Sequence, residues 1–151
     1  MRSQLSIDFL FAIALISVLS VGIISIGLQE NEMANTFSMA TKIKVLSITV
    51  RDSVTKAYSM GPGYSIRLNL PFSVSPSDSI KVTINGTSDL VQIYSTIGGA
   101  MYYTQQKLPV NVISTSSVIL TNESPEFWII VFYNASEGGL DVKVSKSPNF
   151  S

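Results

Sequence analysis

The sequence predicts an α+β fold, in which a long N-terminal hydrophobic α-helix is followed by a small antiparallel β-sandwich-like domain. Three observations support this class. An apolar run without charge or proline extends from Phe9 to Leu28. Neither Gly nor Pro occurs at residues 29–60, so a helix can continue to about residue 60. After Gly63 the hydrophobic period changes to two, which is the period of β-strands.

The apolar run, "FLFAIALISVLSVGIISIGL", has the length of a membrane span. About 20 helical residues rise roughly 30 Å, which is the thickness of the hydrocarbon core of a bilayer. Arg2 precedes the run, and Glu30 and Glu32 follow it. The positive-inside tendency therefore predicts a precursor in the cytoplasmic membrane with its N-terminus inside and everything after Leu28 outside.

The helix is expected to become amphipathic over residues 29–60. One apolar stripe recurs at spacings of three and four, and most charges fall off it. The stripe consists of Met39, Ile43, Leu46, Val50, Val54 and Ala57. We expect this half of the helix, within the predicted range 4–60, to lie on a domain and to stop at Gly61–Pro62–Gly63.

Residues 61–151 are predicted to form about seven strands. Asn85–Gly86 is a strong signal for a type I′ hairpin turn, and Gly98–Gly99 predicts a second turn. The segment "FWIIVFY" is nearly all apolar, so we expect a central strand that is covered on both faces, with Trp128 in the core. One of Tyr102 and Tyr103 should point inward, because neighbouring residues of a strand face opposite sides.

The composition excludes several kinds of chemistry. The 151 residues include 10 Lys+Arg and 10 Asp+Glu, so there is no electrostatic reason to expect nucleic acid as a partner. Charged residues are only 13% and the mean hydropathy is +0.35, which indicates membrane or dense self-association. The absence of Cys and His excludes disulfides, thiol nucleophiles, histidine bases and Cys/His metal sites. We expect no cofactor, no metal and no catalytic residues, and therefore no enzyme.

The N-terminal stretch "MRSQLSIDF" closely resembles the class III signal peptide of archaeal type IV pilins. In that family a short basic leader ending in Gly precedes Gln, an aliphatic residue, Ser, an aliphatic residue and Glu. Here Ser3 stands where the family usually has Gly, and Asp8 replaces the more frequent Glu. The resemblance covers the leader and the hydrophobic helix, and the helix followed by a β domain also looks like an archaeal pilin.

The resemblance implies a processing and assembly pathway. Residues 1–3 would be the leader, and a prepilin peptidase in the membrane would cut between Ser3 and Gln4. The mature subunit would then leave the membrane and join copies of itself in a helical filament at the cell surface, where a role in adhesion is expected. The stretch that starts at Asp8 and Phe9 would enter the filament core.

Asp8 fits this pathway electrostatically. Cleavage would create an α-amino group at Gln4, one helical turn away. A carboxylate and an ammonium about 4 Å apart attract by roughly 4 kcal/mol at an effective dielectric near 20. That attraction would offset part of the several kcal/mol that an unpaired buried charge costs. The amine of the same chain and that of a neighbour both remain open as partners.

Four Asn-x-Ser/Thr triplets predict possible N-glycosylation in the outer domain. They begin at Asn85, Asn122, Asn134 and Asn149. Pro125 directly follows the second triplet, which usually discourages modification. The first Asn also fits a turn without any glycan.

Other functions remain open at this point. A minor pilin or an archaellum filament subunit would share every feature above. A membrane-anchored extracellular β-sandwich that binds a ligand would keep Met1. A secreted protein would be cut after about Gly27, where small residues at Ser25 and Gly27 fit a signal peptidase site.

Overall fold

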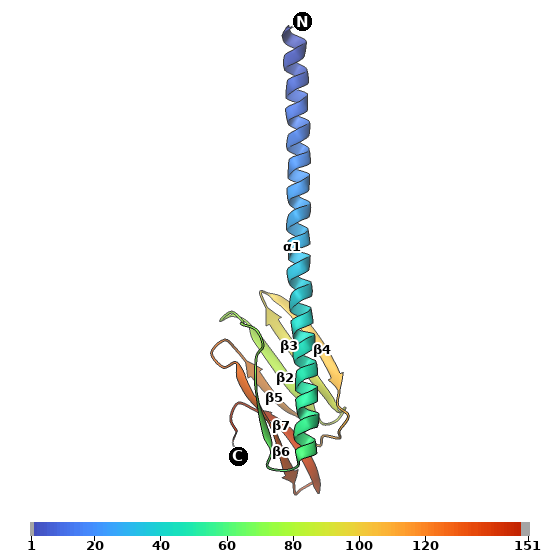
Figure 1. Cartoon of the computed structure of the whole chain (residues 1–151), viewed down its shortest axis with the longest axis vertical. Coiled ribbons are helices and arrows are strands. Elements are labelled where there is room, and N and C mark those ends of the chain that lie inside the picture. The colour runs from blue at the N-terminus through green and yellow to red at the C-terminus, as the bar shows by residue number, and fades with distance from the viewer. Residues whose placement is uncertain (1, 149–151) are drawn as a thin grey trace. The chain divides into compact units, whose positions relative to one another are not determined.

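The structure is a computed structural model that describes the backbone of residues 2–148, and the side chains of residues 7–148 except that of Glu32. It confirms the α+β class (Figure 1). Contacts divide the chain into two units, Met1–Met39 and Ala40–Ser151. The helix within residues 2–148 is α1, Arg2–Met60, which begins two residues before the predicted start at residue 4. The strands are β1 Ser65–Asn69, β2 Ser79–Asn85, β3 Leu90–Ile97, β4 Ala100–Lys107, β5 Ser116–Leu120, β6 Glu126–Asn134 and β7 Gly139–Ser145.

The second half of α1 belongs to the hydrophobic core of the second unit. The predicted stripe is confirmed: Ile43, Leu46, Val50, Val54 and Ala57 are buried, and Met39 is half-buried. The helix ends where Gly61 and Gly63 adopt positive φ angles of 91° and 89°. The Gly63 N–H donates to the carbonyl of Val131 at 2.8 Å, so the chain turns directly onto β6.

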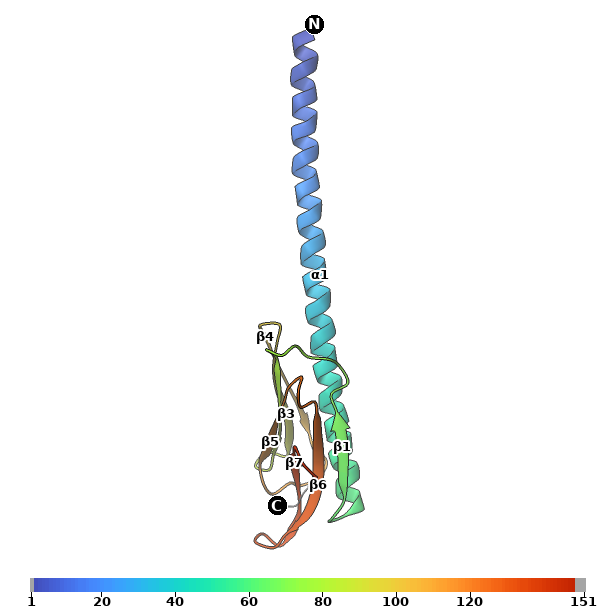
Figure 2. The same ribbon diagram turned by 90° about the vertical axis from the view of Figure 1, so that its left-hand side faces the viewer.

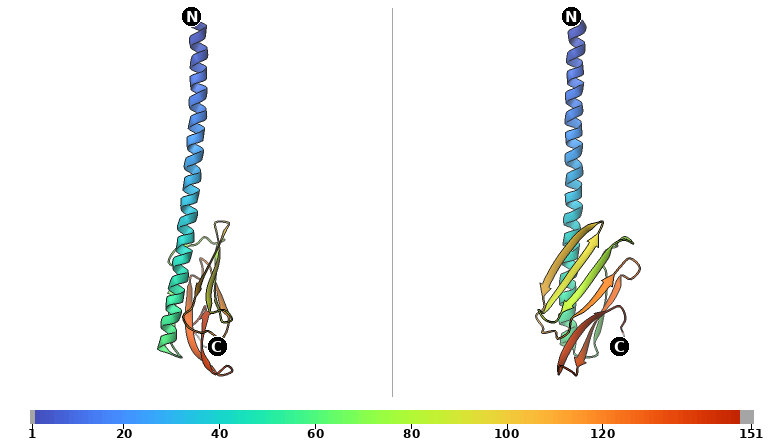
Figure 3. Two further views of the ribbon diagram at one scale, coloured as in Figure 1. Left: turned by 90° about the vertical axis from the view of Figure 1, so that its right-hand side faces the viewer. Right: turned by 180° about the vertical axis from the view of Figure 1, so that it is seen from behind.

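The seven strands form two antiparallel sheets. One has the order β1-β6-β7 and the other the order β4-β3-β2-β5. Residues 40–60 of α1 lie on one side of both sheets (Figures 2 and 3). Strand β6 is central in its sheet, and three consecutive residues, Ile129, Ile130 and Val131, are fully buried. The prediction of a central strand covered on both faces is therefore confirmed.

The two tyrosines of β4 alternate as expected, whereas Trp128 does not occupy the expected core position. Tyr102 is half-buried and Tyr103 is exposed, as the alternation requires. Trp128 is only half-buried, so the prediction of a core position is wrong. It lies across from Arg67 of β1 and Ser145 of β7, on the face opposite to the buried Phe127 and Ile129. Polar neighbours keep that part of the face partly open to water.

The predicted type I′ turn at Asn85–Gly86 is also wrong. Residues 86–89 form a four-residue loop, and its positive φ falls on Asp89, at 52°. Asn85 Oδ1 accepts a hydrogen bond from the Thr87 N–H at 2.9 Å, which is an Asx turn. Gly86 is required for space instead, because a Cβ there would collide with the carbonyl of Ile113. The two-residue turn with two positive φ angles lies at Gly98–Gly99.

Two aspartates hold the long connection between β4 and β5, residues 108–115. Asp89 Oδ1 accepts from the Val112 N–H at 2.9 Å. Asp141, whose side chain is fully buried, accepts from the N–H groups of Ile113 and Ser114, each at 3.1 Å. The N–H groups of Val112, Ile113 and Ser114 are therefore satisfied by carboxylates rather than by a neighbouring strand.

The environment of Asp141 favours its charged form. Burial alone raises the pKa of this carboxyl group. The hydrogen bonds from Ser114, Val142 and Ile113 outweigh burial and hold the pKa of Asp141 below its ordinary value. Because the folded-state pKa is depressed, the stabilisation is complete above the unfolded pKa of about 3.9 and is lost as the pH falls through the lower folded pKa.

We predict that Asp141→Asn lowers the free energy of unfolding by about 2 kcal/mol at pH 7, because an amide offers one acceptor oxygen and turns a donor toward backbone N–H groups. The difference from the wild-type chain should shrink below about pH 4, where the aspartate itself loses its charge. Thermal unfolding of both chains in detergent micelles, followed by Trp128 fluorescence at several pH values, measures this. Glu137→Gln, at an exposed loop position, is the control. Equal destabilisation at every pH would contradict a role for the charge.

Candidate functional site

The candidate functional site is the apolar surface of α1 between Ile7 and Leu28. All its residues are exposed in the single chain, and the large apolar side chains are 45% to 73% exposed. These are Ile7, Phe9, Leu10, Phe11, Ile13, Leu15, Ile16, Val18, Leu19, Val21, Ile23, Ile24, Ile26 and Leu28. Within the described residues, α1 is the one helix long and apolar enough to cross a membrane, a test that an N-terminal signal sequence also passes.

Leaving this surface in water would be very unfavourable. Fully burying one large apolar side chain yields about 1.5–3 kcal/mol, so covering the exposed part of all these side chains yields on the order of 20 kcal/mol. Monomeric soluble proteins rarely expose apolar patches of this extent. The segment therefore needs an apolar surround, which is either lipid or other apolar helices.

Two of the three serines inside the segment bond to the backbone of the helix itself. Ser17 Oγ donates to the Ile13 carbonyl and Ser20 Oγ to the Ile16 carbonyl, each at 2.8 Å and each one turn back along the helix. Such bonds let serine enter an apolar environment without an external partner. The helix is thus suited to a dry surround on all sides.

The predicted processing and assembly residues lie at the start of this segment. Because α1 begins at Arg2, the bond between Ser3 and Gln4 lies in its first turn. Gln4 and Asp8 are one turn apart, which is the spacing that a bond between a new amine and the carboxylate requires. The Asp8 and Phe9 side chains are exposed, whereas those of Ser3 and Gln4 lie outside the described side chains. The cleavage itself stays a prediction.

The four Asn-x-Ser/Thr positions differ in their surroundings. Asn85 and Asn134 are the last residues of β2 and β6, next to hairpin loops. Asn122 is exposed in a turn closed by two backbone hydrogen bonds between Thr121 and Ser124. The Asn134 Nδ2, where a glycan would be attached, donates to Asp141 at 3.4 Å. Asn149 lies outside the described residues.

One surface was missed by the sequence reasoning. The face of the β4-β3-β2-β5 sheet that points away from the core bears a hollow of about 450 Å³, lined in part by Tyr94, Met101 and Ile119. The rings of Tyr94 and Tyr103 contact each other, with centroids 4.5 Å apart. Apolar residues at alternate strand positions were the available signal, but the pattern does not tell which face of a sheet is covered.

The comparisons with known proteins give no relative: no family model, no curated protein and no solved structure matches this chain. The class is therefore defined by architecture alone. A long apolar N-terminal helix that runs into antiparallel sheets is a layout consistent with the type IV pilin-like fold.

We predict that a chain beginning at Ala40 stays monomeric in water without detergent, whereas the whole chain requires detergent. The shortened chain keeps the buried helix residues from Ile43 to Ala57 and loses the apolar surface. Size-exclusion chromatography with light scattering measures the mass of each, and circular dichroism checks that the sheets are retained. Aggregation of the shortened chain would show that another surface drives association.

Proposed function

We propose that this chain is a structural subunit, a pilin, of an archaeal type IV pilus-like filament at the cell surface, with a role in adhesion. It assembles through its hydrophobic N-terminal helix after a prepilin peptidase has removed the leader. The observation that supports this proposal best is the apolar segment from Phe9 to Leu28, all of whose residues are exposed and which continues without a break in α1.

Such a segment suits two successive environments. In the precursor, lipid surrounds it on all sides. In the filament, the same segments of neighbouring subunits replace the lipid, and the hydroxyls of Ser17 and Ser20 need no new partners because they bond within the helix. An extracellular β unit stays in water throughout.

Features of the first turn support leader removal. No acidic side chain lies in the first turn of α1 to stabilise its N-terminal N–H groups. A turn without such stabilisation frays easily, which would let the peptidase bind Ser3–Gln4 in an extended form. After the cut, Asp8 lies one turn from the new amine.

A membrane-anchored extracellular β-sandwich binding module is the second candidate. The hollow beside Tyr94 and Met101 favours it, because exposed aromatic and Met side chains are typical of binding surfaces. This candidate explains the apolar run but gives no purpose to Asp8. An archaellum filament subunit would use the same helix but would assemble into an archaellum instead of a pilus.

The first prediction concerns the mature N-terminus. Material sheared from cells should contain this chain in filaments, and N-terminal sequencing should begin at Gln4. A chain that keeps Met1 and remains a monomer in the membrane would support the anchored module instead. A start near Leu28 would indicate an ordinary secreted protein.

A second prediction concerns Asp8. Asp8→Ala should be cut normally at Gln4 but should yield at least roughly tenfold less filament, because a lost attraction of a few kcal/mol exceeds the 1.4 kcal/mol that a factor of ten requires. Asp8→Glu is the matched control and should assemble, since it keeps the charge. The ratio of chain in sheared filaments to chain in membranes is the readout. Normal filaments from Asp8→Ala would remove this carboxylate from the mechanism.

A further inference from the structure

We propose that Glu30 and Met33 of one subunit pack against Lys42 and Val45 of the next subunit, and that this contact sets the displacement between neighbouring copies. The inference rests on the proposed filament function and specifies the surface by which a second copy of this chain is recognised. It places the contact outside the fully apolar segment, on α1 alone.

The charges of two stretches of α1 are opposite. Residues 29–39 contain Glu30 and Glu32 and no basic residue, whereas residues 40–60 contain four basic residues and one acid. That acid, Asp52, is paired with Arg51 at 2.7 Å. The structure shows no ion pair, among the side chains that it describes, for the three lysines of this stretch: Lys42, Lys44 and Lys56.

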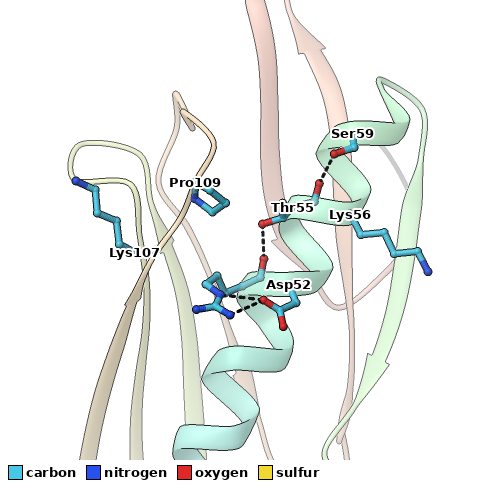
Figure 4. A pocket seen from close by; sticks show the side chains of 7 residues that line it. Asp52, Thr55, Lys56, Ser59, Lys107 and Pro109 are labelled. Atoms are coloured by element: carbon cyan, nitrogen blue, oxygen red, sulfur yellow. Dashed lines mark hydrogen bonds and ion pairs between the residues drawn. The ribbon is translucent and has the colours of Figure 1, made fainter.

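The hollow beside Arg51 is a less suitable place for the acidic stretch. It measures about 530 Å³ and includes Arg51, Asp52, Lys56 and Lys107 in its lining. The Arg51 guanidinium donates two hydrogen bonds to the Asp52 carboxylate, at 2.9 and 2.7 Å. Figure 4 shows that Lys56 and Lys107 point away from each other. The cations do not converge on one point there.

Lys42 instead shares a pattern with Glu30. Met33 follows Glu30 by three positions, and Val45 follows Lys42 by three positions, so each pair lies on one side of the helix. Glu30 and Lys42 are exposed, and the apolar members are 68% exposed for Met33 and 52% for Val45. The pair Glu30 and Met33 is therefore complementary to the pair Lys42 and Val45: the charges are opposite, and the apolar residue has the same spacing from the charge in both.

Two parallel copies can satisfy both pairs at once only if they are displaced. In copies at the same level, Glu30 of one copy would lie about 18 Å along the helix axis from Lys42 of the other, too far for a contact. A displacement of twelve positions along the helix opposes Glu30 to Lys42 and Met33 to Val45 together. Because each copy uses two different surfaces, the contact is heterologous and can repeat without closing, as a filament requires.

Cysteine cross-linking tests the contact directly, because the chain has no native cysteine. Met33→Cys combined with Val45→Cys should give a ladder of covalent oligomers when intact filaments are oxidised. The two positions are three turns apart within one helix, too far for an intramolecular disulfide. Met33→Cys combined with Met101→Cys is the matched control and should give no ladder.

The outcomes separate this inference from the function on which it rests. A ladder from the first pair and none from the control supports the contact. Filaments that form but give no ladder overturn the contact and leave the filament function standing. If the wild-type chain forms no filaments under the same conditions, the proposed function fails and the contact fails with it.

Charge reversal provides an independent measurement. Glu30→Lys should reduce the ratio of filament to membrane chain roughly tenfold, which corresponds to about 1.4 kcal/mol, because one attraction becomes a repulsion. Adding Lys42→Glu should restore the ratio to near that of the wild type. Adding Lys81→Glu, which makes the same change in net charge on the exposed face of β2, should not. Rescue by both second substitutions, or a normal ratio for Glu30→Lys alone, would overturn the contact.

Discussion

The exposed apolar surface of α1 is the constraint on which the rest of this molecule depends. A helix segment that is apolar on every side, with two of its serine hydroxyls bonded to its own carbonyls, is unfavourable in water. The second half of the same helix is covered by its own chain. Its stripe from Ile43 to Ala57 is buried by the two sheets of its own chain. One continuous helix therefore carries a segment that needs other molecules and a segment that does not.

The β unit is held by groups that are far apart in sequence. Carboxylates of Asp89 and Asp141 supply acceptors for the segment 108–115, and Gly86 lets the backbone of Ile113 approach closely. These contacts keep the hairpin loops and the long connection together at one end of the sheets. A unit that is rigid in this way can present a defined outer surface, including the Tyr94 and Tyr103 rings, wherever the helix places it.

Periodicity was sufficient to predict the elements of this fold. The stripe of α1, the seven strands and the buried β6 all follow from patterns that repeat within a few residues. What could not be predicted depends on pairs of residues separated by 23 to 28 positions, such as Asp89 with Val112 and Asp141 with Ile113. The turn at Asn85–Gly86 was predicted wrongly for this reason. Gly86 is required because the Ile113 backbone approaches it closely, and not because a type I′ turn needs it. The exposure of Trp128 likewise depends on which neighbours the sheet order provides.

Burial of the apolar helix cannot by itself select a filament over a membrane. Lipid tails are as apolar as leucine, so the residues from Phe9 to Leu28 would gain little hydrophobic free energy if helices of other copies replaced lipid. The selection must fall on groups whose surroundings change between the two states. On α1 these would be the charged groups: in the proposed filament, Asp8 would gain an amine partner only after cleavage, and Glu30 would meet a lysine only on a displaced neighbour. In the proposed filament, the apolar surface would thus allow the helices to associate, and the few charges would determine when they associate and in which register.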